Sequence, residues 1–118
     1  MSRVKLAPAR RRRKKKVLQQ AKGYRGGRSK LYRTARESVM RAMAYSYRDR
    51  KKRKGDFRRL WITRIRAGVI PEGLSYSAFI HRLHQAGVTI NRKILAELAV
   101  HHPDLFSRIV QEVLKSSS

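Results

Sequence analysis

The side chains in this sequence that could do chemistry are mainly guanidinium and ammonium groups, and their chemistry is the binding of anions. The chain of 118 residues has 31 Lys and Arg against 7 Asp and Glu, a formal net charge of +24. Residues 1–60 hold 24 basic and 3 acidic residues (net +21), whereas residues 61–118 hold 7 and 4 (net +3). A segment this positive repels itself unless a polyanion neutralises it. Nucleic acid fits best, because lysine and arginine release the counterions of its closely spaced phosphates.

The predicted nucleic-acid contacts are basic side chains of the first 60 residues, with one tyrosine among them. Tyrosines interleaved with basic residues can stack on exposed bases, although those in residues 40–47 could equally pack on a neighbouring element. The candidates are Arg10, Arg11, Arg12, Arg13, Lys14, Lys15, Lys16, Tyr24, Arg25, Arg28, Arg33, Arg36, Arg48, Arg50, Lys51, Lys52, Arg53, Lys54, Arg58 and Arg59.

The segment "GYRGGRSK" contains a glycine-rich stretch that could approach a phosphate. It is not a P-loop, because the G-K-[ST] ending is missing and no strand is predicted before it. "GYRG" fits the GXXG of KH domains, but that motif belongs to a mixed α/β fold that this chain does not predict. A glycine turn is therefore the main interpretation. Backbone N–H groups at the start of a following helix would suit a phosphate, and Arg25 and Arg28 flank the turn.

Metal binding and catalysis are not predicted. His81 and His84 are three residues apart and His101 and His102 are adjacent, but further converging ligands would be needed for zinc. The chain has no cysteine, so it has neither disulfides nor thiolate ligands. The seven acids show no paired spacing, and no serine or histidine lies in a nucleophile motif. We expect no enzyme activity, no cofactor and no small-molecule substrate.

A membrane partner is also not predicted. "RRRRKKK" lacks the apolar face of a membrane-surface helix, and no apolar run approaches the roughly 18 residues of a spanning helix. Basic residues at the N-terminus are not followed by the apolar stretch of a secretory signal. We therefore expect a soluble, intracellular protein.

The first half of the chain predicts one long helix after a less ordered segment. Residues 1–22 include Pro8, which should break an early helix, and have little to bury, so we expect disorder or a transient helix. Ser29 is the predicted N-cap of a helix that begins at Lys30 and continues to about Gly68. Its centre is polar on all sides, which indicates solvent or a charged partner around it. Gly55 is a position where this helix can kink.

"GDFRRLWITRI" joins the basic half to an apolar half. On a helical wheel its apolar residues cover an arc of roughly 200°, wider than the stripe of an ordinary surface helix. More than one helix should therefore pack against it. We predict that the structural core of this segment consists of Phe57, Leu60, Trp61 and Ile65.

The remainder predicts short helices with recognisable ends. Ser75 or Ser77 can cap one, which Gly87 ends. Asn91 can cap the next, and Pro103 suits the first turn of the last. The fold class predicted is all-α: a basic N-terminal extension and long bent helix, residues 1–55, running into a small C-terminal helical bundle, residues 56–118.

Several segments, in order, resemble one known family. "AKGYRGGRSK", "RDRKKRKGDFRRLWITRI", "SYSAFIHRL" and "NRKILAELAV" are similar to the bacterial-type large-subunit ribosomal protein L-twenty family, nearly end to end. The resemblance implies an extension and long helix threaded into large-subunit rRNA, a helical C-terminal domain, and a role in early subunit assembly. Two positions in "RIRAG", Arg66 and Gly68, depart from the family's usual sequence.

The partners that follow are large-subunit rRNA and neighbouring large-subunit ribosomal proteins, in a cytoplasmic ribosome or the ribosome of an organelle such as a plastid. The alternative function is that of an architectural DNA-binding or nucleic-acid-compacting protein. Such a protein would need an apolar residue that inserts between bases from a DNA groove, or a dimer that matches regularly spaced DNA half-sites. Neither is evident in the sequence.

Overall fold

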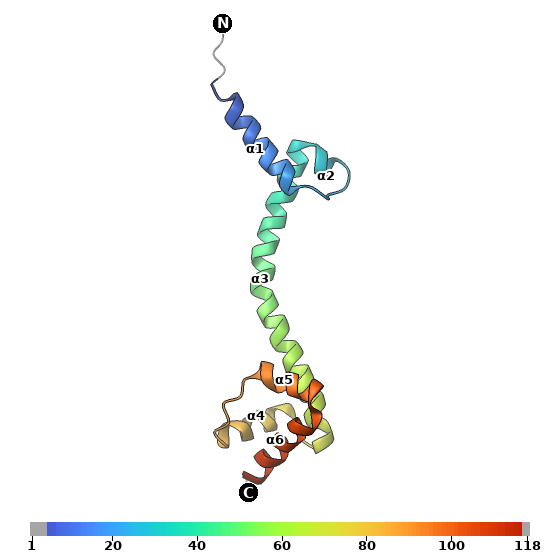
Figure 1. Cartoon of the computed structure of the whole chain (residues 1–118), viewed down its shortest axis with the longest axis vertical. Coiled ribbons are helices and arrows are strands. Elements are labelled where there is room, and N and C mark those ends of the chain that lie inside the picture. Colours follow the sequence, from blue (N-terminus) through green and yellow to red (C-terminus); the bar gives the residue numbers. More distant parts are fainter. Residues whose placement is uncertain (1–4, 117–118) are drawn as a thin grey trace. The chain divides into compact units, whose positions relative to one another are not determined.

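The computed structural model describes residues 5–116, which form helices and no strand. This confirms the all-α fold class. Figure 1 shows the elements, which are α1 (Ala7–Gln20), α2 (Gly27–Lys30), α3 (Tyr32–Val69), the short 3-10 helix η1 (Ile70–Glu72), α4 (Tyr76–Gln85), α5 (Arg92–His101) and α6 (Pro103–Ser116).

Helix α1 forms where disorder or a transient helix was expected. Pro8 lies in its first turn, where the missing N–H would have no partner in any case, so proline starts this helix rather than breaking it. Most of the residues that follow are unbranched and favour helix. Its C-terminal end is fixed by packing, because Val17 and Leu18 contact a small buried cluster. Residues 1–4 of the predicted segment lie outside the described residues.

The predicted N-cap at Ser29 is wrong. Ser29 lies inside the four-residue helix α2, and its hydroxyl donates to the carbonyl of Gly26 at 3.0 Å. Leu31 is extended and separates α2 from α3, which begins at Tyr32. The break follows a glycine turn in which Gly26 has φ +66° and ψ −142°, a conformation that glycine adopts readily and other residues rarely. The end of α3 at Val69 agrees with the expectation.

Helix α3 is the long bent helix that the sequence predicts, with 38 residues. It continues through Gly55 without interruption, and a Cβ at that position would meet no atom within 4 Å. Contacts divide the chain within α3 into two compact units, residues up to 51 and residues from 52 onwards. Whether either unit folds by itself stays a prediction.

The first unit has a very small core. Ala21, after the end of α1, packs against Ala35 and Val39 of α3, and these three are buried. Val17, Leu18 and Tyr24 are partly buried around them. Alanine and valine side chains bury little apolar area, so this core stabilises the unit only weakly.

The second unit has a larger core at the end of α3. Figure 1 shows α4, α5 and α6 gathered around the C-terminal turns of that helix. The rings of Phe79 and Phe106 pack with their centroids 5.8 Å apart. The buried core residues are Ile65 and Val69 of α3, Phe79 and Leu83 of α4, Leu95 and Ala96 of α5, and Phe106, Val110 and Val113 of α6.

The predicted core of the opening turns of this unit is only partly right. Ile65 is fully buried and Trp61 is half-buried against the core. Phe57 and Leu60 are 48% and 41% exposed, so their assignment to the core is wrong. The helices α4–α6 cover the last turns of α3, and the wide apolar arc continues N-terminally beyond them. Phe57 instead stacks on Trp61, with ring centroids 6.3 Å apart.

The short helices begin and end where their capping residues predict. The hydroxyl of Ser75 accepts from the backbone N–H of Ala78 at 3.2 Å, and the side-chain carbonyl of Asn91 accepts from Ile94 N–H at 3.0 Å. Pro103 is the first residue of α6. Gly87, just after α4, has φ +70°. The side chains of Ser75 and Asn91 satisfy N–H groups that would otherwise lack a partner.

Candidate nucleic-acid interface

Helix α1 presents positive charge on all sides. Residues 10–16 are consecutive Arg and Lys, and all are exposed. Because successive residues of a helix are about 100° apart, these side chains surround the helix. The helix contains no acid to neutralise them. Lys14 lies over the ring of Tyr32 in α3, with its Nζ 5.4 Å from the ring centroid. The other six basic side chains are exposed around α1, where they can meet phosphates.

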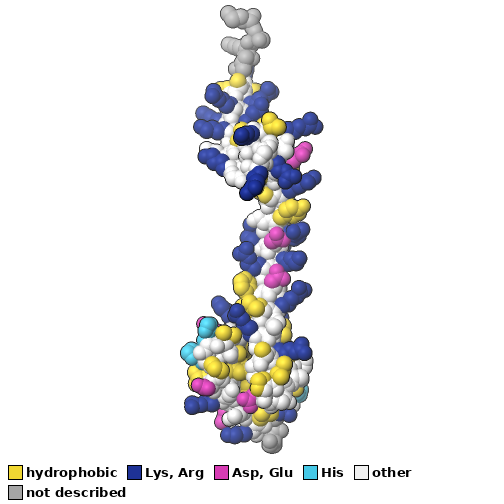
Figure 2. Space-filling view, turned by 90° about the vertical axis from the view of Figure 1, so that its right-hand side faces the viewer, with side chains coloured by type: hydrophobic (Ala, Val, Ile, Leu, Met, Phe, Trp, Pro, Cys, Tyr) yellow, Lys and Arg dark blue, Asp and Glu magenta, His cyan; other side chains and the backbone are white. Residues whose placement is uncertain are grey.

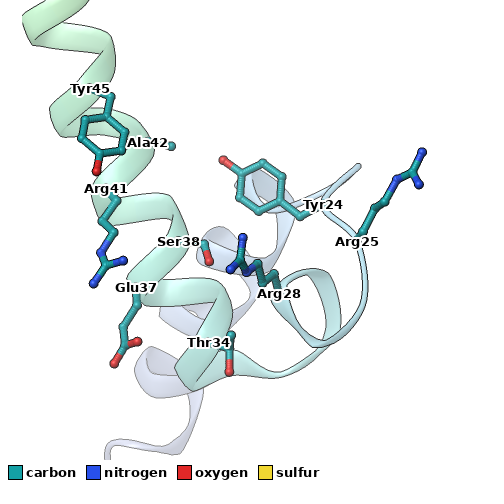
Figure 3. Close-up of a pocket in the computed structure, with 9 residues that line it drawn as sticks. All are labelled: Tyr24, Arg25, Arg28, Thr34, Glu37, Ser38, Arg41, Ala42 and Tyr45. Carbon is teal, nitrogen blue, oxygen red and sulfur yellow. The ribbon is translucent and has the colours of Figure 1, made fainter.

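The glycine turn places three predicted residues at a hollow beside α3. Tyr24, Arg25 and Arg28 line a hollow of about 720 Å³, and Figure 3 shows them opposite one face of the helix. We call this the Tyr24 hollow. Arg25 extends away from the other labelled side chains, whereas Tyr24 and Arg28 lie nearer α3. On the helix side, the residues that line it are Thr34, Glu37, Ser38, Arg41, Ala42 and Tyr45.

None of these six residues on α3 is among the predicted contacts, and two of the six, Glu37 and Arg41, carry charge. Arg41 and Glu37 lie one helical turn apart on the same face of α3, so helical spacing from Thr34 could have grouped them. Helical spacing alone is not sufficient, however, because the position of the glycine turn in the structure decides which face of α3 lines the hollow. By contrast, Arg33 and Arg36 are exposed but do not line this hollow.

Further along α3, Arg48 and Arg50 are exposed and contact nearby side chains of the same helix. Arg48 donates from Nε to Asp49 Oδ1 at 2.9 Å and lies 4.7 Å from the ring centroid of Tyr45. Arg50 donates to Ser46 Oγ at 2.6 Å. Such exposed interactions contribute little stability, so the arginines can exchange them for phosphate.

The basic run after this point continues around the helix. Lys51 lies 4.5 Å from the ring centroid of Tyr47. Lys52, Arg53 and Lys54 are exposed. They form no ion pair within residues 5–116. Since consecutive positions are about 100° apart, these three point to different sides of α3.

The last two candidates, Arg58 and Arg59, are also exposed. Nη1 of Arg59 is 4.0 Å from Oδ1 of Asp56, a long contact between exposed groups. Figure 2 shows the general pattern: dark blue Lys and Arg side chains project from α1, α2 and much of α3, and few acidic side chains accompany them. This surface can neutralise phosphates from several directions.

The described residues form neither a metal-binding cluster nor a membrane-spanning helix. In residues 5–116, no three His, Cys, Asp or Glu side chains gather where they could hold a metal ion. Over the same range, no helix has both the length and the apolar character needed to cross a membrane.

Comparison with known proteins gives one consistent family. The family model described as "Ribosomal protein L20" matches residues 3–109. A large ribosomal subunit protein bL20 of Oleidesulfovibrio alaskensis is 59% identical over 114 residues, covering 97% of each chain. The bL20 of Acholeplasma laidlawii is 56% identical over 111 residues, covering 94% of this chain and 88% of the relative. That of Thermomicrobium roseum is also 56% identical over 111 residues, covering 94% and 95%. With its match across nearly the whole sequence, the chain belongs to the ribosomal protein L20 family.

Proposed function

We propose that the chain is a structural constituent of the large ribosomal subunit, that it binds large-subunit rRNA directly, and that it supports early assembly of the subunit. The observation that carries this proposal is the basic surface of α1 and α3, where residues 10–16 and 50–54 are all exposed Arg and Lys. Members of its family are ribosomal proteins, so the chain is not an enzyme. The architectural DNA-binding alternative is not favoured.

The mechanism follows from the charge. Where rRNA helices crowd together, their phosphates repel, and lysine and arginine between them remove that repulsion while releasing counterions. A helix that is basic on all sides suits a site with RNA on more than one side, because every face then meets phosphate. Lys52, Arg53 and Lys54, spread around α3, provide such a distribution.

We also propose that the second unit contacts neighbouring large-subunit proteins. The second unit has net charge far lower than the first and carries an apolar groove lined by Val88, Ile90, Leu98, Leu105 and Ile109, with others. Leu105 is 46% exposed. Exposed apolar side chains that gather in a groove are typical of protein contacts, so this unit supplies the surface for them.

The experiment is a salt titration of binding to one large-subunit rRNA fragment. The test variant replaces Lys52, Arg53 and Lys54 with glutamine, which keeps the helix-forming character. Each lost phosphate contact reduces the slope of log K against log salt by about 0.7 to 0.9. If RNA surrounds α3, the slope falls by about 2 to 3; if it lies on one side, by about 1.

The matched control removes the same charge elsewhere. Lys93, Arg108 and Lys115, all exposed in the second unit, are replaced with glutamine. The control should change the slope less than the test variant does. Equal changes would show that binding responds only to total charge. A wild-type chain that binds the fragment without a salt-dependent slope would overturn the phosphate-neutralising mechanism, and one that does not bind the fragment would overturn direct rRNA binding.

A further inference from the structure

The Tyr24 hollow contains a tyrosine whose ring is held in place and left open on one side. Tyr24 is half-buried and packs on the cluster of Ala21, Ala35 and Val39, yet it also lines the hollow. Among the tyrosines of residues 5–51, Tyr32, Tyr45 and Tyr47 each have a Lys or Arg over the ring, whereas Tyr24 has none. A fixed aromatic ring with a free face is a platform on which a base can stack at low entropic cost.

The size and lining of the hollow suit one nucleotide. Small-molecule sites have volumes of about 300–1,000 Å³, and the Tyr24 hollow has about 720 Å³. Arg28 comes from the glycine-turn side and Arg41 from α3. A guanidinium group binds phosphate with paired hydrogen bonds. The hollow therefore provides stacking for a base and charge for its phosphate.

Glu37 is the feature that a general phosphate-binding surface does not explain. In residues 5–51 the acids are Glu37 and Asp49, and Asp49 is paired with Arg48. Glu37 lines the hollow and forms no ion pair within the described residues. A carboxylate there repels phosphate, and a hydrogen bond that it accepts from the ligand can offset this cost. Unstacked RNA bases offer such donors as exocyclic amino groups, for example N4 of cytosine, and as the ring N–H groups of guanine and uracil.

We propose that the Tyr24 hollow binds one unstacked nucleotide of rRNA whose base carries an exocyclic amino group. The base stacks on Tyr24, Glu37 accepts from the amino group, and Arg28 and Arg41 hold the phosphate. The inference rests on the proposed rRNA binding and adds to it a place where one base is read. Sequence is read on unstacked bases in this way, whereas phosphate contacts carry no sequence information.

The first test uses the full-length chain and short oligocytidylate as the probe. Tyr24→Leu should bind it about 5- to 150-fold more weakly, the range for losing one stacked base. Tyr24→Phe keeps the ring and should bind as the wild type does. Tyr47→Leu is the matched control, because Tyr47 is a tyrosine on α3, 58% exposed, outside the hollow. It should lose little affinity. Equal losses in Tyr24→Leu and Tyr47→Leu would overturn the proposal.

The second test does not depend on the small core. Glu37 is exposed and alanine favours helix, so Glu37→Ala should leave the helices intact, as circular dichroism would check. Cytosine presents an amino group where uracil presents a carbonyl oxygen. The wild type should therefore prefer oligocytidylate to oligouridylate by about 2- to 10-fold, and Glu37→Ala, whose side chain has no acceptor, should lose that preference. An equal gain of affinity for both probes would mean that Glu37 only repels phosphate, and the proposal would be wrong.

The same variants separate this inference from rRNA binding itself. On the large-subunit rRNA fragment, Tyr24→Leu should keep the salt slope of the wild type, because stacking releases no counterions, while its affinity falls. A wild-type chain that binds the fragment with its full salt slope, but shows no loss in Tyr24→Leu and no base preference, would overturn the nucleotide site alone. Failure of the wild type to bind the fragment would overturn both.

Discussion

Gly68 of α3 faces Phe106 of α6 so closely that a Cβ built on Gly68 would lie 2.7 Å from Cε1 of Phe106. The same Cβ would lie 3.3 Å from Cβ of Ala99 in α5. Phe106 is 1% exposed and its ring packs against Phe79. The absence of a side chain at Gly68 therefore lets the Phe106 ring lie against the backbone of α3. At this position the structure shows a packing role for a residue without a side chain.

Gly68→Ala should lower the stability of the second unit. Alanine gains about 1 kcal/mol over glycine in a helix interior, but forcing an extra carbon into a packed core costs about 1–3 kcal/mol. The ring of Phe106 is buried and packs against Phe79, so the cost should exceed the gain. Thermal unfolding of the full-length chain, followed by the circular dichroism signal of helix, measures the change in melting temperature.

A double-mutant cycle identifies the cause. Phe106→Leu removes part of the ring that the new methyl group meets, so Gly68→Ala should cost less in that background than in the wild type. Gly55→Ala is the control, because a Cβ there meets nothing within 4 Å, and it should raise the melting temperature. If Gly68→Ala stabilises the chain as much as Gly55→Ala does, the close packing at Gly68 is not rigid.

Burial along α3 predicts a graded set of losses. Ile65 is fully buried, so Ile65→Ala should cost about 2–5 kcal/mol. Phe57 is 48% exposed and its main contact is the stacked ring of Trp61, so Phe57→Ala should cost about 0.5–1.5 kcal/mol. Trp61→Ala should fall between them, below the roughly 3–5 kcal/mol of a fully buried tryptophan. Urea unfolding of the three variants gives the order, and a loss at Phe57 equal to that at Ile65 would contradict it.

These residues also show what the sequence could and could not predict. Asn91, Pro103 and Ser75 (with Ser77 as the alternative) were identified as helix starts because their effect is local: each acts within its own first turn. Phe57 and Leu60 were misassigned because a helical wheel gives the direction of a side chain but does not show whether another helix covers it. How far along α3 the other helices reach depends on contacts such as that of Phe106 with Gly68, which are distant in sequence.

The candidate site shows the same division. The basic residues could be found from charge alone, and their exposure in the structure agrees with a surface role. The Tyr24 hollow could not be found in this way, because α2 and the extended Leu31 set which face of α3 meets the glycine turn. Ser29 looked like a cap in the sequence, yet the turn at Gly26 places it inside α2. Local propensity does not determine whether a helix begins at one residue or at another two or three positions away.

The two compact units should differ in whether they fold alone and in how they bind RNA. Residues 52–118 contain the nine-residue buried core of α3–α6, so this fragment should unfold cooperatively on heating. Within residues 5–51 only Ala21, Ala35 and Val39 are buried, and residues 1–51 carry 19 basic residues against 2 acids. Alone, at low salt, they should be mostly unfolded and should gain helix when RNA neutralises them. Circular dichroism with and without the rRNA fragment tests both expectations.

The salt dependence of the two constructs provides the sharper test of this division. If residues 1–51 make about ten phosphate contacts, the slope of log K against log salt should be steeper for the full-length chain than for residues 52–118 by about 7 to 9 on the same rRNA fragment. The affinity of residues 52–118 should be lower and should depend more on the shape of the RNA, because fewer phosphates contribute. A random RNA of equal length is the control, and the full-length chain should keep most of its slope on it. Equal slopes for the two constructs would mean that the basic half does not contact RNA, and direct binding through α1 and the first half of α3 would then be wrong.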